Sequence, residues 1–350
     1  MKKKKIIKIR TTSKHKGWRG VFHINRTPKY PWKKAISAAI TMGLPFLIGA
    51  LFGHIEWGLL AGIGGFTSLY VHNESYKQRA IKLIIVNIGL VVSFALGIIC
   101  GFSFLSTSLI LGIISFLSTF ICSAYKVPPP SGYFFVLVCG IGTGLQMTLT
   151  TALLPIGIAL MGGCLAWLIG MSEWFFDKKE INQTTRNHTW KAALKDSTIL
   201  LASIRNGAAI FVATLIAFAL GFHRPYWVSI SCASVLQGAT ISIILHRSFQ
   251  RSIGTAVGVF IAGGILAQQP SYWLLGLCVM TLQFLVEMII VRNYAFAVVF
   301  ITPLALLIAE TGRSDTDIPA LIEARLLETL LGCAIGLATA YLIWKRSERS

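Results

Sequence analysis

The sequence predicts an all-α protein that crosses a membrane many times. Of its 350 residues, 55% are hydrophobic and only 13% are charged, which leaves too little polar surface to cover a soluble globule of this size. Apolar stretches recur along the chain, and their lengths fit helices that cross the hydrocarbon layer, which need about 20 residues each. The basic residues lie between these stretches. Lipid is therefore the expected solvent and main partner.

Several other classes of protein are excluded. The net charge of +19 does not indicate a nucleic acid partner, because the basic residues neither gather on one amphipathic face nor alternate with stacking aromatics. The seven cysteines lie in apolar stretches without CxxC spacing, so neither disulfides nor a metal site is expected. The sequence has no phosphate-binding loop motif and no HExxH or Ser/His/Asp arrangement. We expect no enzyme activity and no cofactor.

Hydropathy divides the chain into twelve expected spans, in two series of six with a polar linker between them. The first series is Ala35–Leu51, Trp57–Val71, Leu83–Gly101, Leu105–Ala124, Tyr133–Leu149 and Leu153–Phe176. The second series is Gly207–Leu220, Tyr226–Leu245, Ile253–Leu266, Trp273–Val291, Tyr294–Ala309 and Leu326–Trp344.

The basic residues predict which side of the membrane each loop occupies, since Lys and Arg favour the cytoplasmic side. The first 34 residues hold 13 basic and no acidic residues. If this segment is cytoplasmic and the spans number twelve, every Lys and Arg except Arg224, Arg313 and Arg325 falls on the cytoplasmic side. The stretches ESYKQRAIK (74–82) and HRSFQRSIGT (246–255) are then loops. We predict that both termini are cytoplasmic.

The two series match each other at an offset of about 170 residues, which indicates an internal repeat. The matching positions are His54 and His223, Trp57 and Trp227, Gln78-Arg79 and Gln250-Arg251, Gly163-Cys164 and Gly332-Cys333, and Trp174 and Trp344. Because six is an even number, both units insert in the same orientation. The sequence thus predicts two parallel six-helix repeats that form a pseudo-dimer, with a cavity or pathway between them.

This organisation gives five segments. They are a basic cytoplasmic N-terminal segment (1–34), the first repeat (35–176), a cytoplasmic linker (177–206), the second repeat (207–344) and a cytoplasmic tail (345–350). In the linker, Trp190, Leu194, Ile199 and Leu201 among charges predict a short helix at the membrane interface. Small-xxx-small pairs predict close helix packing at Gly58/Gly62, Gly97/Gly101, Gly254/Gly258 and Gly332/Gly336.

Four stretches of the second half resemble one family. They are RPYWVSISCASVLQ (224–237), RSFQRSIGTAVG (247–258), RNYAFAVVFITPLALLIAE (292–310) and ARLLETLLGCAIG (324–336). Together they resemble the fusaric acid resistance superfamily of bacterial membrane proteins, which includes aromatic acid exporters and has the plant aluminium-activated malate channels as distant relatives. The resemblance is specific over 204–345 and faint over 35–175. It implies a bacterial cell membrane and export of organic acids by paired six-helix units without ATP hydrolysis.

Ionisable groups inside hydrocarbon are functional candidates, since they cost several kcal/mol unless paired or wetted. Glu287 is expected in the tenth span, nearer its cytoplasmic end. It is either a proton-coupling carboxylate or a structural group that pairs with Arg292 or reaches the interface.

Gln78-Arg79 and Gln250-Arg251 are expected at equivalent cytoplasmic helix starts. Two guanidinium groups there would ring the inner mouth and bind carboxylates through their bidentate fork. The other interpretation is that these charges only set the topology.

The last two spans contain the remaining candidates. Near their outer ends, Arg325 and Glu328 are one helical turn apart and accompany Glu310 and Arg313, which predicts a structural ion pair or an exit gate. The family-like stretch adds Asn293, Tyr294, Thr302 and Pro303. Pro303 removes a backbone hydrogen bond in mid-span, either to expose a carbonyl to a cavity or to kink the helix for packing.

The sequence as a whole predicts a secondary transporter that exports small organic anions or aromatic acids, driven by the proton gradient. A passive anion channel of the same architecture is the alternative. A third possibility is a membrane scaffold, which predicts a filled interface between the halves and places Arg79, Arg251 and Glu287 against lipid headgroups. Whether the chain works as a single pseudo-dimer or as a homo-oligomer stays open.

Overall fold

The computed structural model describes residues 24–25, 30–72, 74–145, 147–176, 190–238, 240–310 and 317–347. Every regular element in these ranges is helical, which confirms the all-α prediction. Most of the basic N-terminal segment, linker residues 177–189, Arg313 and residues 348–350 lie outside them.

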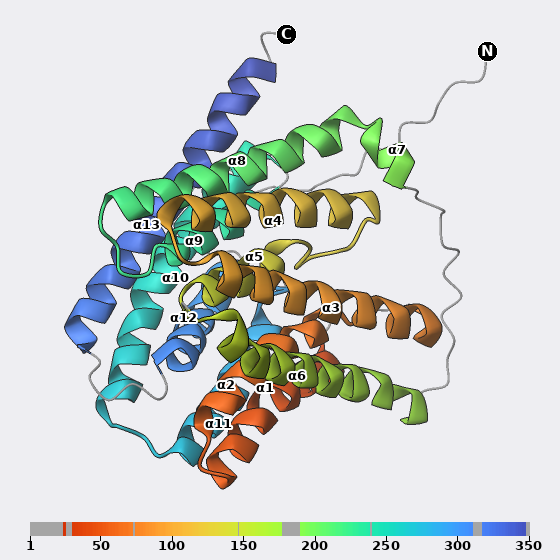
Figure 1. Ribbon diagram of the computed structural model, residues 1–350, viewed down its shortest axis with the longest axis vertical. Helices are drawn as coiled ribbons and strands as arrows, with labels where there is room; N and C mark the ends of the chain where they lie inside the picture. Colours follow the sequence, from red (N-terminus) through yellow and green to blue (C-terminus); the bar gives the residue numbers. More distant parts are fainter. Residues whose placement is uncertain are drawn as a thin grey trace.

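The helices fall into two groups of six around a short linker helix (Figure 1). The first group is α1 (Trp32–Leu51), α2 (Ile55–Gly65) followed by the 3-10 turn η2 (Phe66–Tyr70), α3 (Tyr76–Cys100), α4 (Phe104–Ala124), α5 (Tyr133–Thr143) and α6 (Leu149–Phe176). After α7 (Trp190–Leu194) come α8 (Ser197–Ala219), α9 (Tyr226–Leu236), α10 (Ile241–Ala267), α11 (Tyr272–Ile289), α12 (Tyr294–Glu310) and α13 (Ile318–Ser347).

Seven of the described helices are long and apolar enough to cross a membrane, namely α1, α3, α4, α6, α8, α10 and α11. The helices α5, α9 and α12 are apolar but shorter. Large apolar side chains such as Ile85, Leu117, Phe260 and Leu330 are exposed on the outer faces, as expected where lipid replaces water. The chain is therefore a multi-pass membrane protein, while the number of twelve spans stays a prediction.

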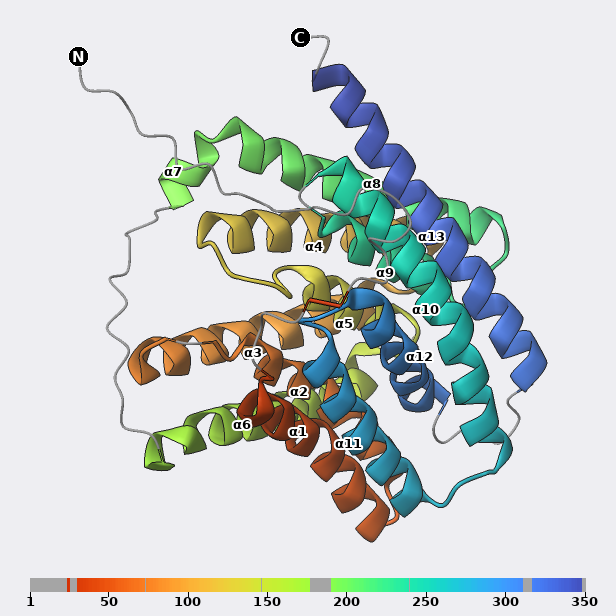
Figure 2. The same cartoon turned by 180° about the vertical axis from the view of Figure 1, so that it is seen from behind.

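Helix contacts follow a paired pattern (Figures 1 and 2). In the first half α2 packs on α6 and α3 packs on α5, and in the second half α9 packs on α13 and α10 packs on α12. The halves meet along two seams, where α1 packs on α11 and α4 packs on α8. Both Figure 1 and its reverse view show α3, α4, α6 and α8 side by side. Two halves built alike would give this pattern, although the repeat itself stays a prediction.

Small residues allow the close approaches that the sequence predicts. A Cβ atom added at Gly97 would lie 2.1 Å from the carbonyl oxygen of Cys139 on α5, and one added at Gly332 would lie 2.3 Å from that of Val228 on α9. Such distances are too short for any side chain, so the backbones of these helices are in direct contact. The predicted role of these glycines in helix packing is confirmed.

The stretch HRSFQRSIGT is not a loop. Helix α10 runs without a break from Ile241 to Ala267 and contains it. Thr240 caps this helix, because its hydroxyl accepts a hydrogen bond from the amide of Ile243 at 3.3 Å. The expected loop at residues 246–252 is therefore wrong, because α10 already begins at Ile241. The loop expected at 74–82 is also mostly helical, since α3 begins at Tyr76. Hydropathy misplaced the boundary because basic side chains buried by tertiary contacts look like a loop in the sequence.

The helix expected in the linker is shorter than predicted. It ends at Leu194, and Asp196 starts α8 by accepting a hydrogen bond from the amide of Thr198 at 3.0 Å. The hydrogen bond from the Thr198 hydroxyl is the main reason that the pKa of Asp196 is lowered, so a negative charge stays at the positive end of α8. Ile199 and Leu201 belong to α8 and not to a linker helix, so their assignment to the linker is wrong.

Candidate anion site between the two halves

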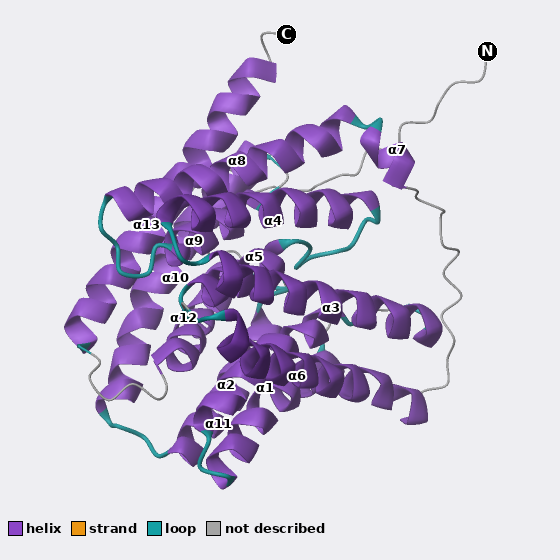
Figure 3. Ribbon diagram, viewed as in Figure 1, coloured by secondary structure: helices purple, strands orange, loops and turns teal. Residues whose placement is uncertain are grey.

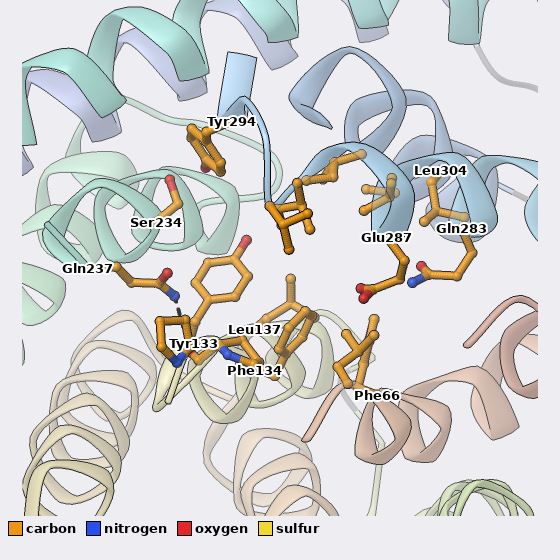
Figure 4. Close-up of a pocket in the computed structure, with 18 of the residues that line it drawn as sticks. Phe66, Tyr133, Phe134, Leu137, Ser234, Gln237, Gln283, Glu287, Tyr294 and Leu304 are labelled. Carbon is orange, nitrogen blue, oxygen red and sulfur yellow. Dashed lines mark hydrogen bonds between the residues drawn. The ribbon is translucent and has the colours of Figure 1, made fainter. Parts of the chain in front are cut away.

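A cavity of about 350 Å³ lies between the halves. We call it the central cavity. The first half contributes residues of α1, η2, α5 and the loop before α5, and the second half contributes residues from the end of α9 and from α10, α11 and α12. Figure 4 shows Gln283 and Glu287 on one side, Gln237 and Tyr294 on the other, and the ring of Tyr133 between them.

Aromatic rings form much of the apolar wall. Phe66 from η2 and Phe134 from α5 stack with their ring centroids 4.6 Å apart, and Tyr133 packs against Phe134 at 5.1 Å. These rings are supported by Leu69 and Leu137, which also line the cavity. The wall therefore suits an apolar or aromatic body.

Two guanidinium groups enter the cavity from α10. Arg247 and Arg251 are four residues apart, so they project from the same helix face. Arg247 donates from Nε to the carbonyl oxygen of Ser234 at 3.1 Å and from Nη2 to Oε1 of Gln237 at 3.2 Å. Its guanidinium also stacks over Tyr294, 4.2 Å from the ring centroid. All of these groups are neutral, so no described contact of Arg247 cancels its charge.

Arg251 is held less completely. Only 3% of it is exposed, and the Tyr294 hydroxyl lies within hydrogen-bonding reach. Its Nε has no hydrogen-bond partner, and none of the ion pairs among the described residues involves it. A buried charge without a counter-charge is costly. Arg251 is therefore a candidate for anion binding in the cavity.

The opposite side of the cavity carries the only acidic group among its described lining residues. Glu287 on α11 pairs with Lys34 on α1 at 3.3 Å, which joins the two halves across their first seam. Of the alternatives for Glu287, pairing with Arg292 is not observed, because its partner is Lys34. One turn earlier on α11, Gln283 is 2% exposed and its Nε2 has no hydrogen-bond partner among the described residues.

Arg79 does not share the cavity with Arg251. Its Nη1 pairs with Glu173 on α6 at 2.7 Å and also donates to the carbonyl oxygen of Gly170, while its Nη2 donates to that of His72. The predicted ring of two equivalent arginines around one mouth is therefore wrong. Arg79 starts α3, whereas Arg251 lies well inside α10 because that helix begins earlier.

The other predicted residues have different positions. Gln78 and Gln250 do not line the central cavity, whereas Tyr294 does. Arg292 lies just after α11, with its guanidinium 3.6 Å from the centroid of the Tyr30 ring. Asn293 caps α12, since its Oδ1 accepts hydrogen bonds from the amides of Ala295 and Phe296.

Thr302 and Pro303 lie where α12 crosses α10. The Thr302 hydroxyl donates to that of Thr255 at 3.5 Å, and Pro303 packs on Gly258. Neither of them lines the cavity, although Ile301 and Leu304 beside them do.

The pair at the start of α13 is buried. Arg325 donates to Glu328 at 3.2 Å, both residues are 2% exposed, and the guanidinium lies 3.7 Å from the Trp227 ring centroid. This geometry fits a structural ion pair. The side chain of Glu310 lies outside the described residues.

Sequence reasoning missed several cavity residues, namely Lys34, Phe66, Tyr133, Gln237, Arg247 and Gln283. Two of them had a signal. Arg247 precedes Arg251 by four residues and Gln283 precedes Glu287 by four, so each pair marks a polar stripe on one helix face within an apolar span. The others come from distant parts of the chain, and no local pattern connects them.

The helix that supplies both guanidinium groups, α10, lies within the part of the chain that matches a family model. Residues 212–339 match the family described as fusaric acid resistance protein-like. The resemblance of the second half is confirmed. No solved structure matches the chain.

Three bacterial proteins are similar to the chain, and two of them are described as membrane proteins. The chain is 28% identical to the Bacillus subtilis membrane protein YvaC over 475 residues, covering 93% of this chain and 74% of that protein. It is 34% identical to the Escherichia coli inner membrane protein YccS over 35% of this chain, and 31% identical to a Haemophilus influenzae protein over 43%. The matched parts are only 17% and 20% of those two proteins. The chain thus resembles multi-pass membrane proteins of bacterial inner membranes.

Proposed function

We propose that the protein exports small organic anions through the central cavity. One observation carries the proposal, namely two buried donors without partners, Arg251 Nε and Gln283 Nε2, that line a cavity with aromatic walls. Other buried donors in the described residues also have no partner, such as Nε of Arg79 and Nε of Arg325, but those side chains do not line the central cavity. A buried donor that lines a cavity can be satisfied by an acceptor on a ligand. A carboxylate would supply acceptor oxygens for these donors and a negative charge to balance the positive charge of Arg251.

The shape of the site favours an acid with an apolar body. A volume of about 350 Å³ is at the small end of the range of about 300–1,000 Å³ for ligand pockets. An aromatic acid would place its carboxylate near Arg251 and its ring against Phe66, Tyr133 and Phe134. The family of the second half supports this class of substrate.

Glu287 gives the site a means of coupling to protons. Its carboxylate forms an ion pair with Lys34, a cation that also lines the central cavity. Proton uptake by Glu287 would break this pair and release Lys34 to attract the anion, so the proton and the substrate would be linked. The open cavity and the buried positions of Arg251 and Glu287 differ from the filled interface that a scaffold would have.

The test is reconstitution of the full chain into liposomes with a panel of aromatic and aliphatic acids. We expect flux of one or more aromatic acids that rises with an imposed pH gradient. Glu287→Gln should keep the protein inserted and remove the response to the gradient, whereas Lys195→Gln, which removes an exposed charge near α8, should behave as wild type. If flux in Glu287→Gln still follows the pH gradient, the proposed role of Glu287 in proton coupling is wrong. A wild-type protein that transports none of the acids would remove the transport proposal.

A further inference from the structure

A second cavity, of about 220 Å³, lies at the other seam between the halves. We call it the lateral cavity. Its lining comes from α4, the loop before α5, α5, α8 and α9, and it shares Pro129, Tyr133 and Gln237 with the central cavity. Hydroxyl groups of Ser115, Thr119 and Ser123 on α4 form its polar side.

Arg205 on α8 is the only charged residue among the described residues that line this cavity. It donates from Nε to Oδ1 of Asn206 at 3.1 Å and from Nη2 to the carbonyl oxygen of Leu236 at 3.5 Å. Both acceptors are neutral, and Nη1 has no partner within the described part of the chain. The Asn206 amide in turn donates to the Thr119 hydroxyl at 3.2 Å.

The two seams differ in one respect that matters for ligands. At the first seam the cation Lys34 on α1 meets a carboxylate, Glu287 on α11. At the second seam α8 and α4 take the corresponding places, and the cation is Arg205. Thr119 follows Ser103, the N-cap of α4, by 16 residues. Glu287 follows Ser271, the N-cap of α11, by the same number of residues. A neutral hydroxyl therefore takes the place of the carboxylate, and no carboxylate among the described residues pairs with the guanidinium.

We propose that the lateral cavity is a second anion site, separate from the central one, which binds a small hydrophilic monovalent anion of the size of a halide or acetate. The guanidinium supplies the charge and the hydroxyl groups supply hydrogen-bond donors. The cavity is smaller than the central one and has hydroxyl groups where that cavity has phenylalanine rings, so an aromatic acid does not fit its chemistry. An anion bound here would balance the charge of Arg205 at the second seam, as Glu287 balances the charge of Lys34 at the first.

The experiment uses the purified full chain in detergent, with bromide as the probe. The thermal unfolding midpoint is followed as sodium bromide replaces sodium gluconate at fixed ionic strength, so that screening stays constant. We expect a saturable rise for the wild type and for Lys195→Gln. Arg205→Gln should need at least about tenfold more bromide, and Thr119→Val, which keeps volume and charge, should need several-fold more.

Two further results decide the proposal. Arg251→Gln should keep the bromide response, because it alters the central cavity alone. No saturable response in the wild type, an unchanged response in Arg205→Gln, or a response lost in Arg251→Gln instead would overturn the lateral site. If Arg205→Gln does not fold, Thr119→Val decides. The measurement involves no membrane and no gradient, so its outcome is independent of the transport proposal.

Discussion

Arg79 and Arg251 correspond to each other in the two halves of the sequence, yet they have opposite surroundings. Arg79 is bound by the Glu173 carboxylate and by two carbonyl groups at the junction of α3 and α6. Arg251 faces the central cavity without any carboxylate partner among the described residues. At the sequence position that corresponds to Glu173, the second half has Ile343. The arginine of the first half is held in an ion pair, and we propose that the arginine of the second half is available to a ligand.

This comparison shows that two charges at matching sequence positions in the two halves can have different surroundings. A paired arginine contributes to packing, and removing one partner leaves the other uncompensated. An unpaired arginine in a cavity costs stability in the empty protein and contributes to binding. The two residues should therefore respond to the same substitution in different assays.

The largest effect is expected for Arg251→Gln. Loss of two charge-assisted hydrogen bonds, worth about 1.5–3 kcal/mol each, should lower organic anion flux by at least about 100-fold. Thermal stability should change little or rise, because the substitution removes a buried charge that has no carboxylate partner among the described residues. Initial rates in proteoliposomes and a melting curve check both parts. Unchanged flux would show that Arg251 does not contact the substrate.

Arg79→Gln should have the opposite profile. Removing one member of a largely buried pair should lower the free energy of unfolding by about 3 kcal/mol, while the folded fraction keeps flux within about twofold of wild type. The double variant with Glu173→Gln should recover part of this stability. If flux per folded molecule falls as far as in Arg251→Gln, the contrast between the two arginines is wrong.

A smaller effect is expected for Arg251→Lys. The charge remains, but the planar fork that binds a carboxylate is lost, and we expect about a tenfold fall in flux, or about 1.4 kcal/mol. Arg79→Lys supplies the matched control. Wild-type flux in Arg251→Lys would mean that the position supplies charge alone.

The smallest effect should come from Thr302→Val. Its hydrogen bond to Thr255 is long, at 3.5 Å, and the residue lies outside the cavity lining. We expect a loss of about 0.5–1 kcal/mol of stability and unchanged flux. A large loss of transport would show that the contact between α12 and α10 is needed for transport. It would contradict the claim that the residues lining the cavity determine the flux.

The sequence predicted the features that depend on composition and local spacing. Lipid as solvent, the helical fold and the contacts of Gly97 and Gly332 follow from apolar length and small-residue spacing, since both act within a single helix. The burial of Glu287 follows in the same way, because an ionisable group in an apolar span must face protein or water.

The rest depends on which distant segments meet, and no local pattern contains that information. The partner of Glu287 is Lys34, more than 250 residues earlier in the chain. The basic stretch at 246–252 looked like a loop because hydropathy does not reveal that Ser234 and Gln237 satisfy Arg247 inside the protein. The walls of the cavity likewise come from both halves.

The most direct test of the account is a structure of the protein with bound 4-bromobenzoate, whose bromine can be located by its anomalous scattering. The account predicts the carboxylate within hydrogen-bonding distance of Arg251 in the central cavity and the bromine among the rings of Phe66, Tyr133 and Phe134. A central cavity that stays empty at a saturating concentration, or a ligand bound elsewhere, would contradict it.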